Sequence, residues 1–281
     1  MNQQNGSEAD MDSSKRNWRF SYDFDTFTDT ERQNELKRLH EQANIARSAE
    51  IMELKKFGLA SGTRALEIGC GPGFVTALMA EECAPGEAFG LDASDELLDA
   101  ANRLVKPQHK NITFIKGDAY ETGLAPASYD FIYNRMIYQH LADPLRAVKE
   151  AKRLLRSGGK IVIADVDAGW QMIEPNCPEF NQLNELACRA QVKVGGDRFI
   201  GRKLPAILEQ AGFKDIKLDI ATFTSLDIDS KKFLDVTTRF KAMQVGTEEA
   251  LRLLEKIDAF WKTFTKPPLI AVSVFFASGT A

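Results

Sequence analysis

Three glycines at alternate positions, Gly69, Gly71 and Gly73, form a candidate ligand-binding loop. We predict that residues 65–74, ALEIGCGPGF, form a short strand, a tight turn and the start of a helix. Glycine lets a backbone turn tightly and approach a ligand closely, and a helix start offers unpaired N–H groups. The loop therefore suits either a pyrophosphate or a nucleoside that carries a carboxylate.

The spacing of the glycines favours the second ligand. A dinucleotide fingerprint needs a third glycine at position 74, where this chain has Phe74. A bulky side chain there hinders close packing of helix against strand. A nicotinamide-dependent oxidoreductase thus stays an alternative that Phe74 disfavours.

Two carboxylates follow later strands. Asp92 ends the second predicted strand about 20 residues after the loop, where an acid can accept both ribose hydroxyls. Asp118 follows the third predicted strand, where it can accept a hydrogen bond from an adenine amino group. Taken singly, Asp92 is equally well explained as a cap of the helix that begins at Ser94, and Asp118 as a turn residue. In this order after the loop, they indicate a nucleoside site.

The elements around these residues alternate between strand and helix. Strand patterns cover 63–68, 88–91, 112–115, 129–133 and 161–166, and helical patterns lie between most of them. This alternation is typical of βαβ units and a mostly parallel sheet. A further helix is predicted over 28–57, opened by a capping box of Thr28 and Glu31 and ended by Gly58.

Two connections are longer than the about 2–6 residues usual in such folds. We predict helical insertions at about 168–201 and 223–267, with helices near 230–244 and 247–263, which cover the carboxyl edge of the sheet. The predicted organisation is a flexible segment 1–27, a helical cap 28–58 and an α/β domain 59–281 that carries both insertions.

The ordered segments LEIGCGPG, GLDAS, KGDA, YDFIYNRMIYQHLADP and LLRSGGKIVIAD resemble the class I S-adenosylmethionine-dependent methyltransferases, in particular the small-molecule group with a UbiE-like methyltransferase-domain core. The resemblance covers about residues 60–166. It implies a Rossmann-like, doubly wound seven-stranded sheet, mostly parallel with an antiparallel last strand. It also implies direct in-line methyl transfer from S-adenosyl-L-methionine to an O, N or C atom, which leaves S-adenosyl-L-homocysteine. A non-catalytic cofactor-binding regulatory or partner protein is the alternative.

The resemblance also implies which residues hold the cofactor. The glycines line its methionine part, Glu67 orders the loop, Asp92 holds the ribose, Asp118 and Ala119 border the adenine, and Asn134 and Arg135 lie beside the sulfonium. The full predicted set is Glu67, Gly69, Cys70, Gly71, Gly73, Asp92, Ala93, Asp118, Ala119, Asn134, Arg135 and Gln42, the last reaching the cofactor carboxylate from the first helix.

A general base is needed only when the acceptor is a hydroxyl. His140 and Asp165 follow the fourth and fifth predicted strands and are the candidates. A structural role, such as capping a helix, explains His140 better than catalysis does, and turn and cap roles explain Asp165 equally well. Candidate acceptor contacts are Tyr22, Tyr138, Trp170 and Arg198, and plain packing is the alternative for the aromatic ones.

Composition excludes several other functions. Lys and Arg number 36 against 40 Asp and Glu, a net charge of −4, without the basic excess of a nucleic-acid binder. Asn134-Arg135-Met136-Ile137 stands where DNA amino-methyltransferases have an Asp/Asn/Ser-Pro-Pro-aromatic motif. The four cysteines and three histidines lack metal-ligand spacing. No apolar run approaches the ~20 residues of a membrane span, and residues 1–17 lack a secretory signal. We expect a cytoplasmic monomer or homodimer whose partner is a small-molecule acceptor.

Overall fold

The computed structural model describes residues 24–226, 228–266 and 268–281. Its centre is a seven-stranded sheet of order β3-β2-β1-β4-β5-β7-β6, in which only β7 runs antiparallel to its neighbours β5 and β6. The strands are β1 (Ala65–Ile68), β2 (Ala88–Asp92), β3 (Ile112–Lys116), β4 (Tyr129–Arg135), β5 (Leu155–Glu174), β6 (Lys214–Thr224) and β7 (Leu269–Thr280). The predicted doubly wound fold with an antiparallel last strand is confirmed.

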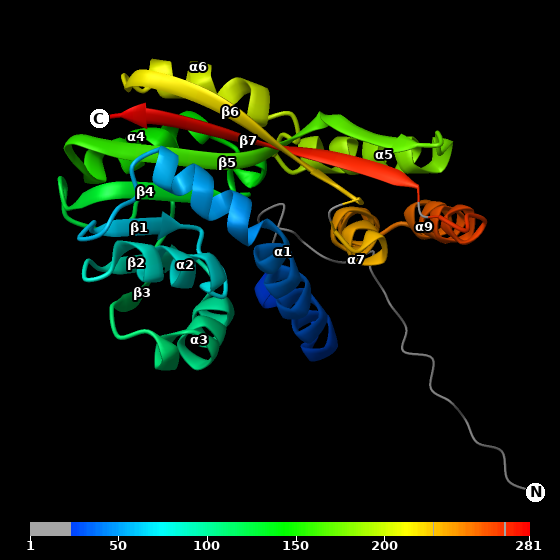
Figure 1. Cartoon of the computed structure of the whole chain (residues 1–281), viewed down its shortest axis with the longest axis horizontal. Coiled ribbons are helices and arrows are strands. Elements are labelled where there is room, and N and C mark those ends of the chain that lie inside the picture. Colours follow the sequence, from blue (N-terminus) through cyan, green and yellow to red (C-terminus); the bar gives the residue numbers. More distant parts are fainter. Residues whose placement is uncertain (1–23, 227, 267) are drawn as a thin grey trace, which may run out of the picture.

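Helices cover both faces of this sheet (Figure 1). The α-helices are α1 (Asp29–Lys56), α2 (Phe74–Cys83), α3 (Asp95–Leu104), α4 (Pro144–Leu154), α5 (Pro178–Lys193), α6 (Leu204–Gln210), α7 (Ser230–Leu234), α8 (Phe240–Val245) and α9 (Glu248–Lys262). The capping box is present at the start of α1, where Glu31 N–H donates to Thr28 Oγ1 and the Glu31 carboxylate accepts from Thr28 N–H. Gly58 follows α1 with a φ of +114°, which explains why the helix stops there.

The first insertion differs from the prediction. Residues 168–174 belong to β5, which pairs with β7 as far as Glu174 and Leu269, so the insertion begins as strand and becomes helical only at α5. The register shifts between Val166 and Gln171, where a bulge interrupts the ladder. The extended β7 supplies pairing partners that the local sequence of β5 does not reveal.

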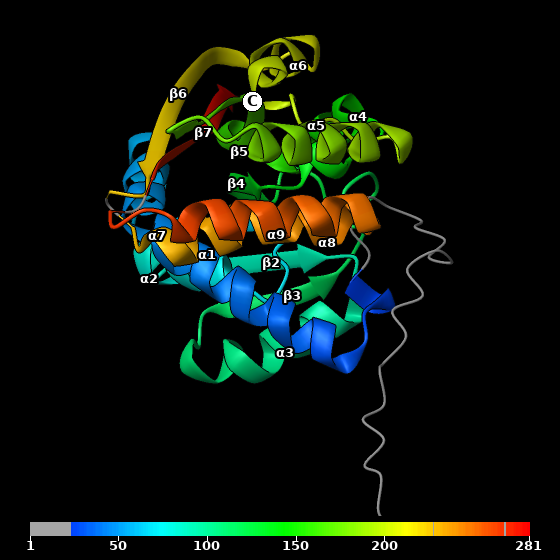
Figure 2. The same ribbon diagram turned by 90° about the vertical axis from the view of Figure 1, so that its right-hand side faces the viewer.

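The second insertion is helical, as predicted. Helices α7 and α8 are joined by a π-helical turn, η6 (Asp235–Arg239), and α9 follows. Figures 1 and 2 show α5, α7 and α9 gathered at the end of strands β5 to β7 that lies away from β3. These helices share a hydrophobic core of their own, with Phe180, Leu183, Leu254 and Ile257 among its buried residues.

Two further apolar cores lie on the two faces of the sheet. One packs α4 and α6 against it through residues such as Val148 and Leu208, and the other packs α1 and α2 through residues such as Leu54 and Met79. Within the described residues, no helix is sufficiently long and apolar to span a membrane.

Candidate functional site

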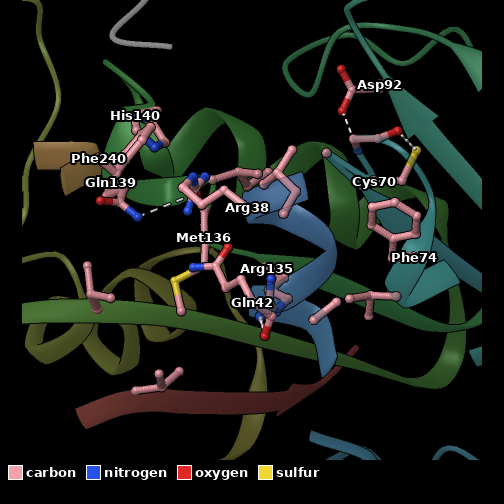
Figure 3. Close-up of a pocket in the computed structure, with 18 of the residues that line it drawn as sticks. Arg38, Gln42, Cys70, Phe74, Asp92, Arg135, Met136, Gln139, His140 and Phe240 are labelled. Carbon is pink, nitrogen blue, oxygen red and sulfur yellow. Dashed lines mark hydrogen bonds between the residues drawn. The ribbon is translucent and has the colours of Figure 1, made fainter. Parts of the chain in front are cut away.

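A cavity of about 430 Å³ opens at the carboxyl ends of β1, β2 and β4, within the size range of small-ligand sites. The predicted glycine loop and both predicted carboxylates lie at one end of it. Figure 3 shows Asp92 and Cys70 at that end, His140 and Phe240 at the other, and Arg135 and Gln42 between. Helix α1, the bulge of β5 and the second insertion complete the wall.

The glycine loop needs its glycines for two different reasons. Gly69, Gly71 and Gly73 all have positive φ, a conformation that other residues adopt only with strain. A Cβ at Gly73 would lie 2.5 Å from the Phe114 ring, whereas a Cβ at Gly71 would meet no protein atom within 4 Å. Gly71 and not Gly73 lines the cavity, so Gly73 shapes the loop from behind and Gly71 leaves room for a ligand.

Asp92 links the loop to the next helix. Its Oδ2 accepts a 2.7 Å hydrogen bond from Gly71 N–H, and its Oδ1 accepts one of 3.0 Å from Ser94 N–H. Burial raises the pKa of this carboxyl while the backbone N–H groups oppose the rise. Ser94 separately caps α3, so the helix-cap role considered for Asp92 belongs to Ser94. The remaining lone pairs of Asp92 suit ribose hydroxyls.

The other cofactor candidates of this end lie on the same wall. Asp118 accepts a 2.7 Å hydrogen bond from Tyr120 N–H, which is the turn geometry considered for it, and it also lines the cavity. Ala93 and Ala119 stand beside the two acids. Glu67 accepts a 2.5 Å hydrogen bond from the Thr76 hydroxyl, and burial raises its pKa to about 8.

Arg135 holds helix α1 against the cavity. Its Nε lies 2.8 Å from Glu50 Oε1, and its Nη2 donates to the Gln42 carbonyl at 3.4 Å. Gln42 and Arg135 both line the cavity, as predicted. Asn134 does not: its side chain is buried and donates to Ile68 O at 3.4 Å. The strand alternation that brings Arg135 to the cavity turns Asn134 away.

His140 lines the far end of the cavity and is held by a chain of amides. Arg198 donates to Gln244 Oε1, Gln244 Nε2 donates to Gln191 Oε1 at 2.7 Å, and Gln191 Nε2 lies 3.0 Å from His140 Nδ1. Arginine only donates, so it fixes the orientation of each amide in turn, and Nδ1 of His140 must accept. Burial lowers the pKa of His140 to about 3. The ring is therefore neutral at pH 7, with its proton on Nε2.

The other predicted catalytic and acceptor residues do not all reach the cavity. Asp165 is fully buried, accepts hydrogen bonds from the backbone of Gln139 and Val166, and is absent from the wall. Tyr138 is equally buried in the core, and Trp170 is half exposed and packs edge-on against Phe275. Tyr22 lies outside the described residues. Arg198 alone of this acceptor set lines the cavity.

Sequence reasoning missed the residues that the caps contribute. The π-helical turn and the start of α8 bring Val236, Thr237, Phe240 and Lys241 to the cavity, and α1 brings Arg38, whose guanidinium lies 4.2 Å from the centre of the Phe240 ring. Irregular helical turns of this kind are frequent at functional sites. The sequence signal that could have found them is Lys241, a basic residue within the apolar pattern of 230–244.

Three acidic and two basic side chains of the wall occupy different parts of it. Glu67, Asp92 and Asp118 surround the glycine loop, whereas Arg198 and Lys241 lie with His140 in the other part. The acidic part, with its open space at Gly71, fits a nucleoside that carries a positive centre. Among the described residues, no cluster of three His, Cys, Asp or Glu side chains could hold a metal ion.

Known proteins with similar sequences carry the same domain. A family model described as "Methyltransferase domain" matches residues 66–163. An uncharacterised transposon protein of Streptomyces fradiae is 30% identical over 174 residues, which cover 60% of this chain and 49% of that protein. The demethylmenaquinone methyltransferase of Staphylococcus aureus is 26% identical over 59% of this chain and 73% of its own length.

Solved structures agree on the fold. A S-adenosylmethionine-dependent methyltransferase of Thermotoga maritima superimposes with a TM-score of 0.52 at 18% identity, over 88% of this chain and 95% of that one. Residues 66–163 are thus similar to a methyltransferase domain, and the seven-stranded sheet has the fold of S-adenosylmethionine-dependent methyltransferases.

Proposed function

We propose that the chain transfers a methyl group from S-adenosylmethionine to an O, N or C atom of a small-molecule acceptor. The observation that carries the proposal is one continuous cavity with two parts of different chemistry: an acidic part around Gly71, Asp92 and Asp118, and a second part under the caps. A binding protein needs only the first part. The second gives an acceptor a place beside the bound cofactor.

The acidic part accounts for the cofactor. Asp92 accepts from the ribose hydroxyls, Asp118 and Ala119 border the adenine, and Gly71 leaves room for the methionine part beside Glu67. Arg135 and Gln42 position helix α1 across the same space. These assignments follow from the geometry of the wall and from the family pattern.

S-adenosylmethionine supplies the activated methyl group on its sulfonium, so no covalent enzyme intermediate is required. The chain has to position an acceptor in line with the methyl–sulfur bond and to exclude water. Leu39 of α1, and Val236 and Phe240 of the second insertion, place apolar surface on the acceptor side of the cavity. They reduce the local dielectric there and make the acceptor's orientation specific.

His140 has a defined part in this arrangement. With Nδ1 accepting from Gln191, the neutral ring presents an N–H and not a lone pair at Nε2. We propose that His140 does not remove a proton from the acceptor. A neutral amine is nucleophilic without the help of a base, so amine acceptors suit this site.

Two measurements test the function. Isothermal titration with S-adenosylmethionine should show saturable binding, and cell extract supplied with methyl-labelled cofactor should yield a labelled small molecule and S-adenosylhomocysteine. Absence of binding at millimolar cofactor would contradict the proposal. Binding without release of S-adenosylhomocysteine from any extract fraction would favour the non-catalytic alternative. NADH, titrated in parallel by fluorescence, should not bind.

A further inference from the structure

Two buried cationic side chains face the acceptor part of the cavity without a carboxylate partner. Arg198 is 5% exposed and Lys241 is 9% exposed, and both line the wall. Among the ion pairs of the described residues, neither side chain occurs. Both side chains thus carry charge into a buried site that does not neutralise it.

Their hydrogen bonds go to neutral groups. Lys241 Nζ donates to Gln171 Oε1 at 2.6 Å and to Asn184 Oδ1 at 3.1 Å, and Arg198 donates to Gln244. The Nε of Arg198 is buried and has no hydrogen-bond partner among the described residues. Amide acceptors orient a cation but do not compensate its charge, and an unpaired buried charge is costly.

The charged groups near the pair confirm this imbalance. Burial is the main cause that lowers the pKa of Lys241 to about 7 and that of Arg198 to about 10, and Arg198 itself disfavours the charge on Lys241. Arg38 is a further cation close to Arg198. The nearby acid Asp165 already accepts hydrogen bonds from the backbone, and burial raises its pKa to about 7.

A second acid near these cations is also paired with another group. Asp167 forms a double hydrogen bond with Arg202, whose Nε and Nη2 lie 2.5 and 2.6 Å from its two oxygens. It lines the wall but its charge is compensated outside the cavity. Among the described residues, Arg198 and Lys241 are therefore left without a counter-ion, whereas Arg38 pairs with Glu35.

We propose that the acceptor carries an anionic oxygen group, a carboxylate or a phosphate, which Arg198 and Lys241 bind. The inference rests on the proposed function and names the class of its substrate. The site's geometry supports it, because the guanidinium and ammonium enter from different elements, the loop after α5 and helix α8, onto the same cavity. Such charge-assisted hydrogen bonds to an oxyanion are stronger than those to neutral acceptors.

The test uses the full chain saturated with S-adenosylhomocysteine, titrated calorimetrically with inorganic phosphate and, separately, with acetate. We expect one of the two ions to bind in the millimolar range, and that ion identifies the group. Arg198→Met and Lys241→Met should each weaken the binding of that ion at least tenfold. Arg189→Met, which removes an exposed cation from α5, and Lys262→Met, which removes one from α9, should leave the affinity unchanged.

The dissociation constant of S-adenosylmethionine separates the two proposals and also shows that each variant is folded. It should be the same in all four variants as in the wild type. If Arg198→Met or Lys241→Met weakens binding of the cofactor as much as binding of the ion, these cations hold the cofactor's own carboxylate and the inference is wrong. It is equally wrong if neither ion binds, or if the exposed-site variants lose the ion as well. If the wild type fails to bind the cofactor, the proposed function itself fails.

Discussion

The carboxylate of Glu50 on helix α1 lies 2.8 Å from Nε of Arg135 at the end of strand β4, and both residues are nearly excluded from solvent. The Tyr133 hydroxyl donates to the same carboxylate oxygen. One buried acid thereby joins the N-terminal helix to two residues of a central strand. Since α1 also forms a wall of the cavity, this contact couples the stability of the helix to the shape of the site.

Replacing Glu50 with Gln should destabilise the fold by about 3–5 kcal/mol, because it leaves the buried Arg135 cation uncompensated. Urea denaturation measures the change. The matched control is Glu81→Gln, which breaks the half-exposed pair with Arg47 and should cost less than about 1 kcal/mol. Equal losses in the two variants would show that the Glu50 contact is only packing.

Asp92→Asn should weaken binding of S-adenosylmethionine at least tenfold, about 1.4 kcal/mol, because the ribose hydroxyls lose a charged acceptor. Titration calorimetry measures the dissociation constant. Asp99→Asn, at an exposed position of α3, removes the same charge away from the cavity and should have no effect. An unchanged affinity in folded Asp92→Asn would refute the ribose assignment.

Substitutions of two loop glycines should separate folding from binding. Gly73→Ala places a Cβ 2.5 Å from Phe114 and 3.3 Å from Ala101 in a strained conformation, so we expect a lower melting temperature. Gly71→Ala meets no protein atom within 4 Å, so its stability should fall by only about 1 kcal/mol from backbone strain. The added methyl enters the ligand's space, and cofactor affinity should drop sharply. If both variants lose similar stability and both still bind the cofactor, the separate roles of the two glycines are wrong.

The predicted site residues that line the cavity include three whose positions are fixed by strand ends. Gly71, Asp92 and Asp118 follow short apolar strands, so the parallel sheet must bring them to one edge. Lys241 and Glu50 lie on helices outside the matched domain, and no local sequence pattern predicts where such helices pack against the sheet. The pairing with β7 that prolongs β5 also depends on residues about 100 positions away.

The same distinction explains the predicted residues that missed the cavity. Asn134 and Arg135 are adjacent on a strand, so only one can face the site. Tyr138 and Asp165 lie next to residues that do line the cavity, but core packing buries both. Sequence distance to a strand end locates a site to within a few residues, and side-chain direction then depends on the local backbone.

His140 should stay neutral, with its proton on Nε2, from about pH 5 to about pH 9. Its pKa is lowered to about 3 by burial, and Gln191 Nε2 donates to Nδ1. Nitrogen-15 NMR of the imidazole reports both tautomer and titration. A His140 signal that titrates near pH 6.5 would overturn the assignment.

The sign of the stability effect of His140 follows from the same shift. Its folded pKa, about 3, lies below the unfolded value of 6.5, so the unfolded chain binds more protons between these two pH values. Its contribution is present above pH 6.5 and is lost as the pH falls towards 3. The urea midpoint of the wild type should therefore fall across this window, and His140→Gln should make it less sensitive to pH.

Glu67 gives the opposite sign and links stability to the ligand. Burial raises its folded pKa to about 8 from 4.5, so its contribution is present below pH 4.5 and is lost as the pH rises through 8. The carboxyl of the ligand-free protein is therefore protonated at pH 7, with the Thr76 hydroxyl as its neighbour. Glu67→Gln should remove this alkaline loss of stability, which urea midpoints at pH 6 and pH 9 (about 2 units below and about 1 unit above the shifted value) would show.

Binding of S-adenosylmethionine should reverse the protonation of Glu67. The ligand brings two positive centres, its sulfonium and its amino group, to a wall where Glu67 lies beside the glycine loop, and a nearby cation favours the ionised carboxylate. Binding at pH 7 should then release a proton from the protein. Calorimetric titration in phosphate and in Tris, whose ionisation enthalpies differ, measures that proton as a difference between the apparent binding enthalpies. Glu67→Gln has no proton to release at this position, so its two apparent binding enthalpies should agree. If they still differ in this variant, the proton comes from another group and Glu67 is only a structural residue of the loop.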